Sequence, residues 1–340
     1  MLNNSSILIT GGTGSYGRAL IDFLLKNKKI RRLVIFSRDE LKQYELKKLY
    51  SDKRYSNLRF FLGDIRDKDR LKRALVDIDY VFHAAALKQV DTAEYNPFEF
   101  VKTNIVGSQN LIDAALDSQV KKILALSTDK ASSPINLYGA TKLCSDKLFI
   151  SANNITGRKD IKFSVLRYGN VMFSRGSILP LLLNRYFDNK KFEITDKRMT
   201  RFNIELDQAI KLSINCFKNM SGGELYVPKL KSYKVIDLAN AINSEKKIKI
   251  IGIRPGEKIH EEMISNPDSY NTFMLKDLFI IVDPSNKKLI KKYSKLKMMS
   301  PNTSYNSYNN PNYLSKSDLK KIINRYKNLY LQKNRKYNEI

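Results

Sequence analysis

Histidine and cysteine are scarce in this chain, with two of each among 340 residues. His83 and His260 are too few for a histidine-based metal cluster or a hydrolase triad, so we expect no metal site. Cys144 and Cys216 lie far apart and lack the spacing of metal ligands. We therefore expect no disulfide framework, and the reducing cytoplasm is the expected location.

Long apolar runs are also absent, since no run reaches the length of a membrane span. The opening stretch "MLNNSSILIT" lacks the charged start and the cleavage site of a signal peptide. We therefore expect no membrane partner.

Acidic residues are few, with 34 against 61 basic residues and a formal charge of +27. The lysines are spread along the chain and do not form one basic stripe with interleaved aromatic residues. We therefore favour solvated basic faces over a nucleic-acid site, although the charge would attract phosphorylated substrates.

Short apolar runs alternate with helical patterns through the first half of the chain. The runs predict strands at 6–10, 31–37, 58–64, 79–85, 121–127 and 162–170. Apolar residues spaced three and four apart predict helices at 17–27, 69–77, 106–118 and 137–153. Such alternation is typical of a parallel sheet covered on both faces. The predicted fold class is α/β, a Rossmann-type doubly wound parallel sheet with a smaller C-terminal substrate-binding α/β domain.

The pattern changes after residue 170, where motif-like loops alternate with shorter elements, as in a smaller domain that closes over a cleft. Residues 284–315 are rich in Ser, Asn, Tyr and Lys and are expected to be loop-like, before a final helix at 315–332. We predict a cofactor-binding domain (1–170, joined by some later segments), a substrate-binding domain (171–283) and a C-terminal loop and helix (284–340).

A glycine-rich loop, "GGTGSYG", lies between the first strand and the first helix. Gly11 permits a tight turn, Gly14 lets the backbone approach a pyrophosphate, and Gly17 lets the helix pack closely on the strand. This context predicts a dinucleotide site formed by Gly11, Thr13, Gly14, Ser15, Tyr16 and Gly17.

The end of the second strand indicates which dinucleotide binds. Ser37 and Arg38 stand where a carboxylate usually meets a free ribose 2′-OH, and Lys42 follows one turn later. Arg38 can bind a phosphate with two hydrogen bonds, so NADP is favoured over NAD, although Asp39 can turn inward instead. The expected cofactor contacts here are Ser37, Arg38, Asp39, Glu40, Leu41 and Lys42.

Two further strand ends complete the predicted cofactor site. "GDIRD" places Asp64 and Ile65 near the adenine, and "HAAALK" offers Ala84, Ala85 and Ala86, followed by Lys88, near the nicotinamide ribose. We expect His83 to be a packed strand residue.

The stretch "STDKASSPINLYGATK" contains Tyr138 and Lys142, which lie one helical turn apart. An ammonium beside the phenol lowers the pKa of Tyr138, which makes it a base for an alcohol being oxidised. Lys142 can also hold the ribose hydroxyls, and Thr128 can hydrogen-bond the substrate oxygen. Together they predict alcohol–ketone chemistry with hydride transfer.

Asp129 and Lys130 stand at the same strand end. A helix-capping aspartate and a solvated lysine are the structural alternative. If a sugar C4 becomes a ketone, its C5 proton becomes acidic, and a lysine whose pKa is lowered towards ~7–8 can remove it. A protonated Asp129 can then donate to the C6 hydroxyl as water leaves, and with hydride returning at C6 the net reaction is a dehydration.

Motifs along nearly the whole chain resemble one family. They are "TGGTGSYG", "SRDELKQ", "HAAALK", "AEYNP", "STDKASSPINLYGATKLCSDKLF", "RYGNV", "SRGS", "RMTRF" and "GIRPGEK". The chain is similar to the inverting UDP-N-acetylglucosamine 4,6-dehydratases (5-epimerising) of bacterial pseudaminic-acid biosynthesis, in the extended short-chain dehydrogenase/reductase superfamily. Retaining relatives carry Asp-Glu where this chain has Asp129-Lys130.

The resemblance implies bound NADP, a UDP-sugar substrate, a homo-oligomer that is often a hexamer, and a role upstream of flagellin or surface-glycan decoration. Lys130 would be the base, Asp129 the acid at C6, and Tyr138, Lys142 and Thr128 the redox group. Val171 would join the cofactor site. The implied UDP-sugar contacts are Lys88, Asn170, Arg175, Gly176, Ser177, Ile178, Leu179, Pro180, Thr195, Arg201, Arg254 and Glu257.

The chain departs from the family pattern at four positions. Gln89 and Asp91 stand where His and Pro are common, Phe173 where glycine is usual, and Asn203 where an aromatic residue is usual. A phenyl group at Phe173 can narrow the sugar pocket, which leaves the exact hexosamine open.

Two other functions stay open. A sugar-nucleotide 4-epimerase would share the cofactor half, Tyr138 and Lys142, but would not need Asp129 and Lys130. A non-catalytic NADP-binding protein that binds a polyanion would not explain an intact Tyr-Lys-Thr set.

Overall fold

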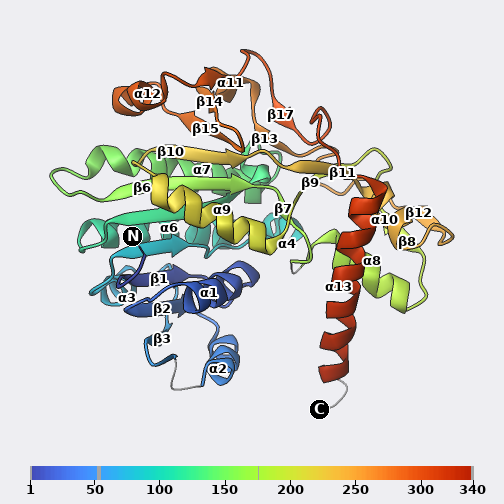
Figure 1. Cartoon of the computed structure of the whole chain (residues 1–340), viewed down its shortest axis with the longest axis horizontal. Helices are drawn as coiled ribbons and strands as arrows, with labels where there is room; N and C mark the ends of the chain where they lie inside the picture. Colours follow the sequence, from blue (N-terminus) through green and yellow to red (C-terminus); the bar gives the residue numbers. More distant parts are fainter. Residues whose placement is uncertain (1, 52–54, 175, 338–340) are drawn as a thin grey trace.

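The computed structural model describes residues 2–51, 55–174 and 176–337, with side chains described up to residue 331. Within these residues a central sheet has ten strands (Figure 1). Seven neighbouring strands are parallel, in the order β3 (Leu58–Leu62), β2 (Arg32–Ser37), β1 (Ser6–Thr10), β4 (Tyr80–His83), β5 (Lys122–Thr128), β6 (Lys162–Tyr168) and β10 (Glu224–Pro228). Three antiparallel strands extend it, β15 (Leu278–Val282), β14 (Thr272–Met274) and β16 (Lys297–Met298).

Helices cover both faces of this sheet (Figure 1). One face carries α1 (Ser15–Asn27), α2 (Glu40–Leu49) and α9 (Leu206–Asn219), and the other carries α3 (Lys68–Ala74), α6 (Gly107–Leu116) and α7 (Leu137–Ser151). The central strands are apolar along their whole length because both faces are buried, as in β1, where every residue is buried. The predicted doubly wound Rossmann-type sheet is confirmed.

The predicted strand 162–170 is wrong at its end, because the chain leaves the large sheet at Gly169. A β-carbon on Gly169 would lie 2.6 Å from Cβ of Phe202, so only glycine allows this close packing. Residues 170 and 171 instead form β7 (Asn170–Val171), in a second sheet with β9 (Thr200–Ile204) and β11 (Lys231–Lys234). This turn brings Asn170 next to the end of β5.

A smaller part of the molecule contains α8 (Ile178–Phe187), α10 (Val235–Ile242), β8 (Phe192–Ile194), β12 (Ile248–Ile250) and α13 (Lys316–Tyr337). These helices and β8 share one hydrophobic core. Elements after residue 171 contribute to both parts, because α9, β10, β14 and β15 belong to the large sheet and its helix layer (Figure 1).

The loop-like prediction for 284–315 is wrong at 287–293, which form α12 (Lys287–Tyr293). Leu289 and Tyr293 of this helix are buried, although lysines dominate its sequence and hide the apolar spacing. Residues 305–306 form β17 (Tyr305–Asn306), which pairs with β13 (Glu262–Ile264). The short elements that complete the chain are α4 (Val90–Tyr95), α5 (Pro97–Phe100), η2 (Val101–Val106), η3 (Asp129–Ala131), η4 (Ala152–Ile155) and α11 (Asn266–Ser269).

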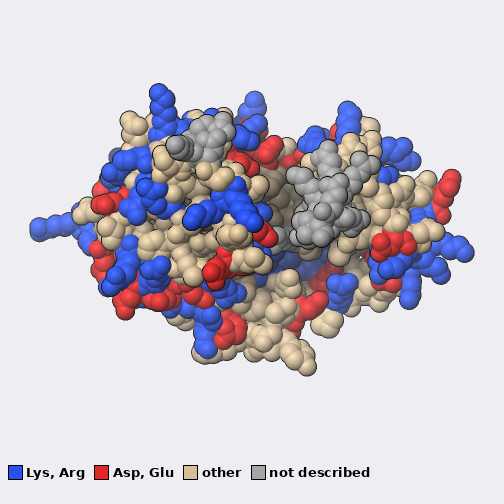
Figure 2. All heavy atoms as spheres, turned by 90° about the horizontal axis from the view of Figure 1, so that it is seen from below, with Lys and Arg blue, Asp and Glu red and all other residues tan. Residues whose placement is uncertain are grey.

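Basic and acidic side chains are interleaved over the face shown in Figure 2. Many surface lysines pair with carboxylates, for example Lys68 with Asp113 at 2.7 Å and Lys72 with Asp117 at 3.0 Å. The same face is hollowed between the larger part on the left and the smaller part on the right. Across the described ranges, no helix is both long and apolar enough to cross a bilayer.

A buried ion pair lies below the end of β5. Arg167 Nη2 lies 3.2 Å from Asp146 Oδ2, and both side chains are about 2% exposed. The hydroxyl of Ser127 donates to the same carboxylate oxygen at 2.7 Å, and Arg167 also donates to the carbonyl of Met263. These bonds fix the strand end that carries Thr128 and Asp129.

Asp146→Asn is expected to lower the free energy of unfolding by about 3 kcal/mol, because it leaves the buried Arg167 charge with only the more distant Asp268 carboxylate, 3.9 Å away, as counter-ion. Urea unfolding followed by circular dichroism measures this change. Asp160→Asn is the matched control, because Asp160 is 88% exposed and its pair with Lys162 should contribute less than about 1 kcal/mol. Equal effects of the two substitutions would contradict the prediction.

Candidate active site

The glycine loop and the "HAAALK" stretch meet at the carboxyl ends of β1 and β4. Gly11 has φ +66°, and a β-carbon there would lie 2.8 Å from the backbone of Ala84 and Ala85. The backbone N–H of Gly14 donates to the carbonyl of Gly11 at 3.0 Å, and α1 begins at Ser15. Two backbones this close, beside a helix N-terminus, form the cradle that a dinucleotide pyrophosphate requires.

Not every side chain of the glycine loop faces this cradle. The hydroxyl of Tyr16 donates to Ser213 of α9 at 2.6 Å, and the ring is buried in the core. A β-carbon on Gly17 would overlap Gly12, which explains the tight packing of α1. The Thr13 hydroxyl lies 2.8 Å from that of Ser37, at the end of β2.

The end of β2 exposes an arginine beside the cradle. The Arg38 side chain is 51% exposed, and its Nη1 lies 3.6 Å from Asp64. Asp39 caps α2 by accepting from the backbone N–H of Lys42 at 2.9 Å, and its carboxylate also pairs with the Lys42 ammonium. Binding of a ribose hydroxyl by Asp39 would thus compete with its role as the helix cap of α2. Of the other predicted contacts, Glu40 and Leu41 are exposed in the first turn of α2, and Ile65 is buried.

Two buried polar residues hold the "HAAALK" stretch. His83 is packed as expected, with Nδ1 2.7 Å from the Thr10 hydroxyl, and burial lowers its pKa to about 3. Asn104 of η2 was not predicted, yet its side-chain amide bonds both the N–H and the carbonyl of Leu87 at 2.9 Å. Ala86, Lys88, Gln89 and Asp91 follow on the surface.

Thr128, Asp129 and Lys130 form one cluster at the end of β5. Asp129 is fully buried, and its Oδ1 accepts from the Thr128 hydroxyl at 3.0 Å and from Lys130 Nζ at 3.1 Å. Lys130 Nζ also donates to Asn170 Oδ1 at 3.3 Å. The second oxygen of Asp129, Oδ2, is buried and has no hydrogen-bond partner among the described residues.

Glu261 completes this cluster, although sequence analysis did not identify it. Its Oε1 lies 3.1 Å from Lys130 Nζ and 3.6 Å from Arg201 Nε, and its Oε2 is buried without a hydrogen-bond partner in the part of the chain that the structure describes. Glu261 lies just before β13. It stands 131 positions after Lys130 along the chain. The "HEEM" stretch has no local signal that links it to β5.

The charges of this cluster contradict the expectation that the pKa of Lys130 is lowered. Burial alone would lower it, but the carboxylates of Asp129 and Glu261 outweigh burial and raise the pKa of the ammonium. Burial also raises the pKa of Asp129, and the nearby negative charge of Glu261 adds to that effect. The raised pKa makes Asp129 easier to protonate, as its expected role as the acid requires, although the Lys130 ammonium opposes this shift. A neutral Lys130 requires a proton to leave the ammonium.

Tyr138 and Lys142 lie on the buried side of α7. A β-carbon on Gly139 would overlap the carbonyl oxygen of Lys130, so this glycine lets α7 approach the cluster. Burial raises the pKa of Tyr138 to about 12, against the lowering effects of Lys130 and of a hydrogen bond with Thr128. Lys142 Nζ donates to the carbonyl of Leu126 at 2.9 Å, and burial lowers its pKa. The main cation that lowers the pKa of Tyr138 is thus Lys130.

The loop before β13 closes over the catalytic stretch. Asn136, which caps α7, donates to the carbonyl of Gly256 at 2.7 Å, and Lys258 Nζ donates to the carbonyl of Ser132 at 2.6 Å. These bonds bring together two regions that lie more than a hundred residues apart in the sequence.

Four of the predicted UDP-sugar contacts lie together at this loop. Arg201 Nη2 lies 3.4 Å from Glu257 Oε1, and the Thr195 hydroxyl donates to the same oxygen at 3.5 Å. Arg254 is exposed, and its backbone N–H donates to Glu257 at 3.4 Å. An arginine beside hydrogen-bonded carboxylate and hydroxyl groups can bind a diphosphate or a ribose.

The loop that enters α8 carries the other predicted contacts. Ser177 caps α8, whose first turn contains Ile178, Leu179 and Pro180, and Leu179 is fully buried in the smaller core. Gly176 has φ +76° and Val171 is half-buried, whereas Arg175 lies outside the described residues.

Phe173 is directed towards α13. Its ring stacks on Tyr326, with centroids 4.6 Å apart and an interplanar angle of 18°. Its backbone has φ +62°, in the left-handed region that favours glycine.

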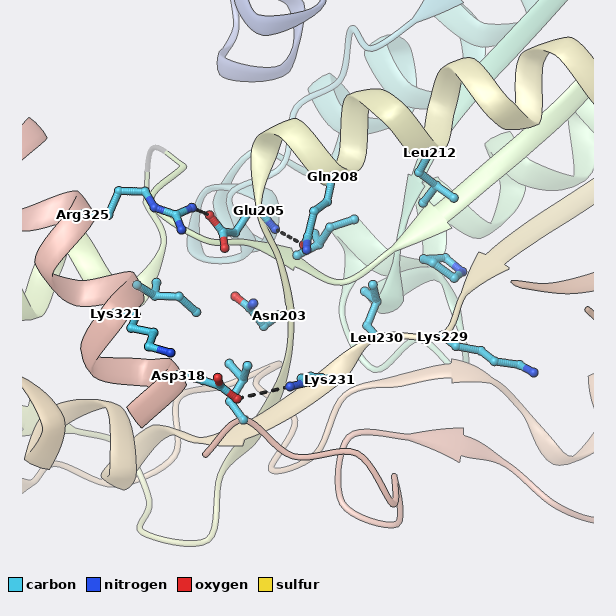
Figure 3. Close-up of a pocket in the computed structure, with 14 residues that line it drawn as sticks. Asn203, Glu205, Gln208, Leu212, Lys229, Leu230, Lys231, Asp318, Lys321 and Arg325 are labelled. Atoms are coloured by element: carbon cyan, nitrogen blue, oxygen red, sulfur yellow. Dashed lines mark hydrogen bonds and ion pairs between the residues drawn. The ribbon is translucent and has the colours of Figure 1, made fainter. Parts of the chain in front are cut away.

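An open pocket of about 470 Å³ lies between α9, β11 and α13 (Figure 3). Asn203 lines it, and across it Arg325 pairs with Glu205 while Lys231 pairs with Asp318 at 3.2 Å. Its described lining residues include none of the predicted catalytic or UDP-sugar contacts. The asparagine at position 203, where the family pattern has an aromatic residue, therefore lines this pocket next to α13.

Comparisons with known proteins agree with this geometry. Residues 7–283 match the family described as polysaccharide biosynthesis protein. A UDP-N-acetylglucosamine 4,6-dehydratase (inverting) of Campylobacter jejuni is 48% identical, over 95% of this chain and 98% of its own length. A UDP-glucose 4-epimerase of Rickettsia bellii is 42% identical, over 79% of this chain and 80% of its own. The X-ray structure of Pen from Bacillus thuringiensis has a TM-score of 0.88 and 39% identity, and the match covers 96% of this chain and 99% of Pen.

Proposed function

Because the chain belongs to the polysaccharide biosynthesis protein family, within the extended short-chain dehydrogenase/reductase superfamily, we propose that it is an inverting UDP-N-acetylglucosamine 4,6-dehydratase. The product would be UDP-2-acetamido-2,6-dideoxy-β-L-arabino-hexos-4-ulose. The observation that carries the proposal is the contact of Lys130 with Asp129 at 3.1 Å, in one buried cluster with Thr128 and Tyr138. The Campylobacter relative, whose name states this activity, supports it.

NADP would be held at the glycine-rich loop, because the tight turn at Gly11 packs on the backbone of Ala84 and Ala85 and leads directly into the N-terminus of α1, which can bind a pyrophosphate. When bound, its nicotinamide supplies the chemistry that takes a hydride from the sugar C4 and gives it back at C6. Tyr138 removes the proton of the C4 hydroxyl, and Thr128 orients that oxygen. Lys142 fixes the strand end through its bond to Leu126.

Elimination follows at C5 and C6. One proton passes from the Lys130 ammonium to the Asp129 carboxylate along their 3.1 Å hydrogen bond, which converts the ion pair into an amine and a carboxylic acid. The amine takes the C5 proton, the C5–H electrons form the C5–C6 double bond, and the C6–O bond breaks. Asp129 gives its proton to the leaving hydroxyl, so water departs and the ion pair is restored. C5 then receives a solvent-derived proton on the opposite face, which gives the inversion, and Tyr138 releases to solvent the proton that it took from the C4 hydroxyl.

Incubation with UDP-N-acetylglucosamine in D₂O, followed by NMR of the product, tests this function. We expect a 4-keto-6-deoxy sugar with deuterium at an inverted C5. The similarity to a UDP-glucose 4-epimerase supports a second candidate, a 4-epimerase. A C4 epimer without deuterium would establish that candidate and refute the dehydratase.

The cofactor preference has its own test. Arg38→Ala is expected to weaken NADP binding by about 10- to 100-fold, the effect of losing one or two charge-assisted hydrogen bonds, and to change NAD binding little. Isothermal titration calorimetry measures both affinities. Arg31→Ala is the control, because Arg31 is an exposed arginine just before the opposite end of β2. An equal loss for NAD and NADP would show that Arg38 does not read the 2′-phosphate.

We also propose the setting that the family resemblance implies. The cofactor would lie against residues 1–170 and the UDP-sugar against 171–283, in a cytoplasmic homo-oligomer, with the hexamer as the expected form. The reaction would be the first step of pseudaminic-acid biosynthesis, ahead of flagellin or surface-glycan decoration. Light scattering tests the oligomeric state.

A further inference from the structure

Phe173 holds a backbone conformation that an aromatic residue rarely adopts. At φ +62° the β-carbon of an L-residue crowds the backbone carbonyl oxygen, and the family pattern has glycine at this position. Such a conformation persists only where surrounding contacts hold it in place.

The contacts that hold it come from the C-terminal helix, α13. Phe173 stacks on Tyr326, and at the far end of α8 Phe187 stacks on Tyr330, with centroids 5.1 Å apart and an interplanar angle of 3°. Lys327 Nζ lies 4.1 Å from the ring centroid of Tyr186. Contacts from one helix therefore reach both the chain leading into α8 and the last turn of α8.

The helix α13 is itself firmly anchored. Leu319, Ile322, Ile323 and Tyr326 are buried in the core of the smaller part, together with residues of α8 and α10. This anchored half can therefore act as a rigid support for the elements that pack on it. Figure 1 shows α13 in red beside α8, running on past the body of the molecule.

We propose that Tyr326 is a positioning residue for the UDP-sugar site: its stack on Phe173 holds the left-handed turn and so places the first turn of α8. This inference rests on the proposed function, which assigns the residues from Ser177 to Pro180 to the UDP-sugar. The inference gives a shared positioning role to the basic C-terminal helix α13 and to Phe173, the aromatic residue at a position where the family pattern has glycine.

Kinetics of the full-length enzyme with UDP-N-acetylglucosamine test the proposal. Tyr326→Ala should raise KM by about tenfold, the effect of one lost stacking contact, and leave kcat within about threefold. The kcat is spared because Tyr326 has no described contact with Asp129, Lys130 or Tyr138. Leu329→Ala is the matched control, an exposed apolar residue on the same helix, and should leave both constants unchanged.

A Phe173→Gly background separates positioning from general destabilisation. Glycine adopts φ near +60° without support, so Tyr326→Ala should change KM by less than about threefold in that background. The same increase in KM in both backgrounds would overturn the proposal. If Tyr326→Ala does not fold, Tyr326→Leu keeps the apolar volume without the ring, and the same comparison decides.

Hydrogen–deuterium exchange without substrate gives a readout that does not depend on the reaction. The first turn of α8 should exchange faster in Tyr326→Ala than in Leu329→Ala, and equal rates would overturn the proposal. A wild-type enzyme that leaves UDP-N-acetylglucosamine unchanged would instead refute the proposed function, whatever the exchange rates are.

Discussion

Lys130→Ala is expected to reduce the rate of dehydration by about 10²–10⁴-fold, the usual contribution of a general base. In the proposed mechanism the amine takes the C5 proton, and Asp129, Glu261 and Asn170 hold Nζ at distances of 3.1, 3.1 and 3.3 Å. Turnover of UDP-N-acetylglucosamine in D₂O, followed by NMR, measures both the rate and the incorporation of deuterium at C5.

Two controls accompany this variant. Lys147→Ala removes an exposed lysine from α7 and should leave turnover unchanged. Thermal unfolding checks the fold, because the substitution leaves the buried Asp129 without its cation and Glu261 with only Arg201. A folded Lys130→Ala enzyme with normal turnover would show that Lys130 is a structural ion-pair partner and not the catalytic base.

Tyr138→Phe is expected to block the oxidation of C4, which precedes the elimination, and to reduce turnover by about 10²–10⁴-fold. In the proposed mechanism the Tyr138 oxygen, as the phenolate, accepts the C4 hydroxyl proton, and its hydrogen bond with Thr128 places it at the end of β5. Without a C4 ketone the C5 proton is not acidic, so deuterium should enter neither the product nor recovered substrate.

The ring of Tyr138 packs at 6.5 Å from that of Phe100, and phenylalanine keeps this contact, so the variant should fold normally. Tyr95→Phe is the control, because Tyr95 is 91% exposed and lies outside the cluster. Deuterium at C5 of substrate recovered from Tyr138→Phe would show that another group performs the oxidation.

Local patterns predicted the secondary structure of the first half well, because each depends on neighbouring residues. The "GGTGSYG" loop needs only a strand before it and a helix after it, and the structure has both. The apolar runs of the first half predicted the parallel strands for the same reason. The strand end at Gly169 was missed because its cause, contact with Phe202, comes from β9.

The electrostatics of the site could not be predicted from local sequence. The pKa of Lys130 depends on Glu261, and the strand end below it depends on the pair of Arg167 and Asp146. Asn104, which holds the "HAAALK" backbone, comes from a π-helix that no periodic pattern indicates.

The sequence by itself determined the Rossmann-type sheet, the dinucleotide loop and the set of residues at the end of β5. These depend on periodicity and on short motifs, which act over a few residues. Only the tertiary structure decided the charge state of Lys130, the partner of Phe173 and the contact of the loop at Gly256 with α7. Each of these joins segments distant in the chain, and charge and packing depend on distance in space.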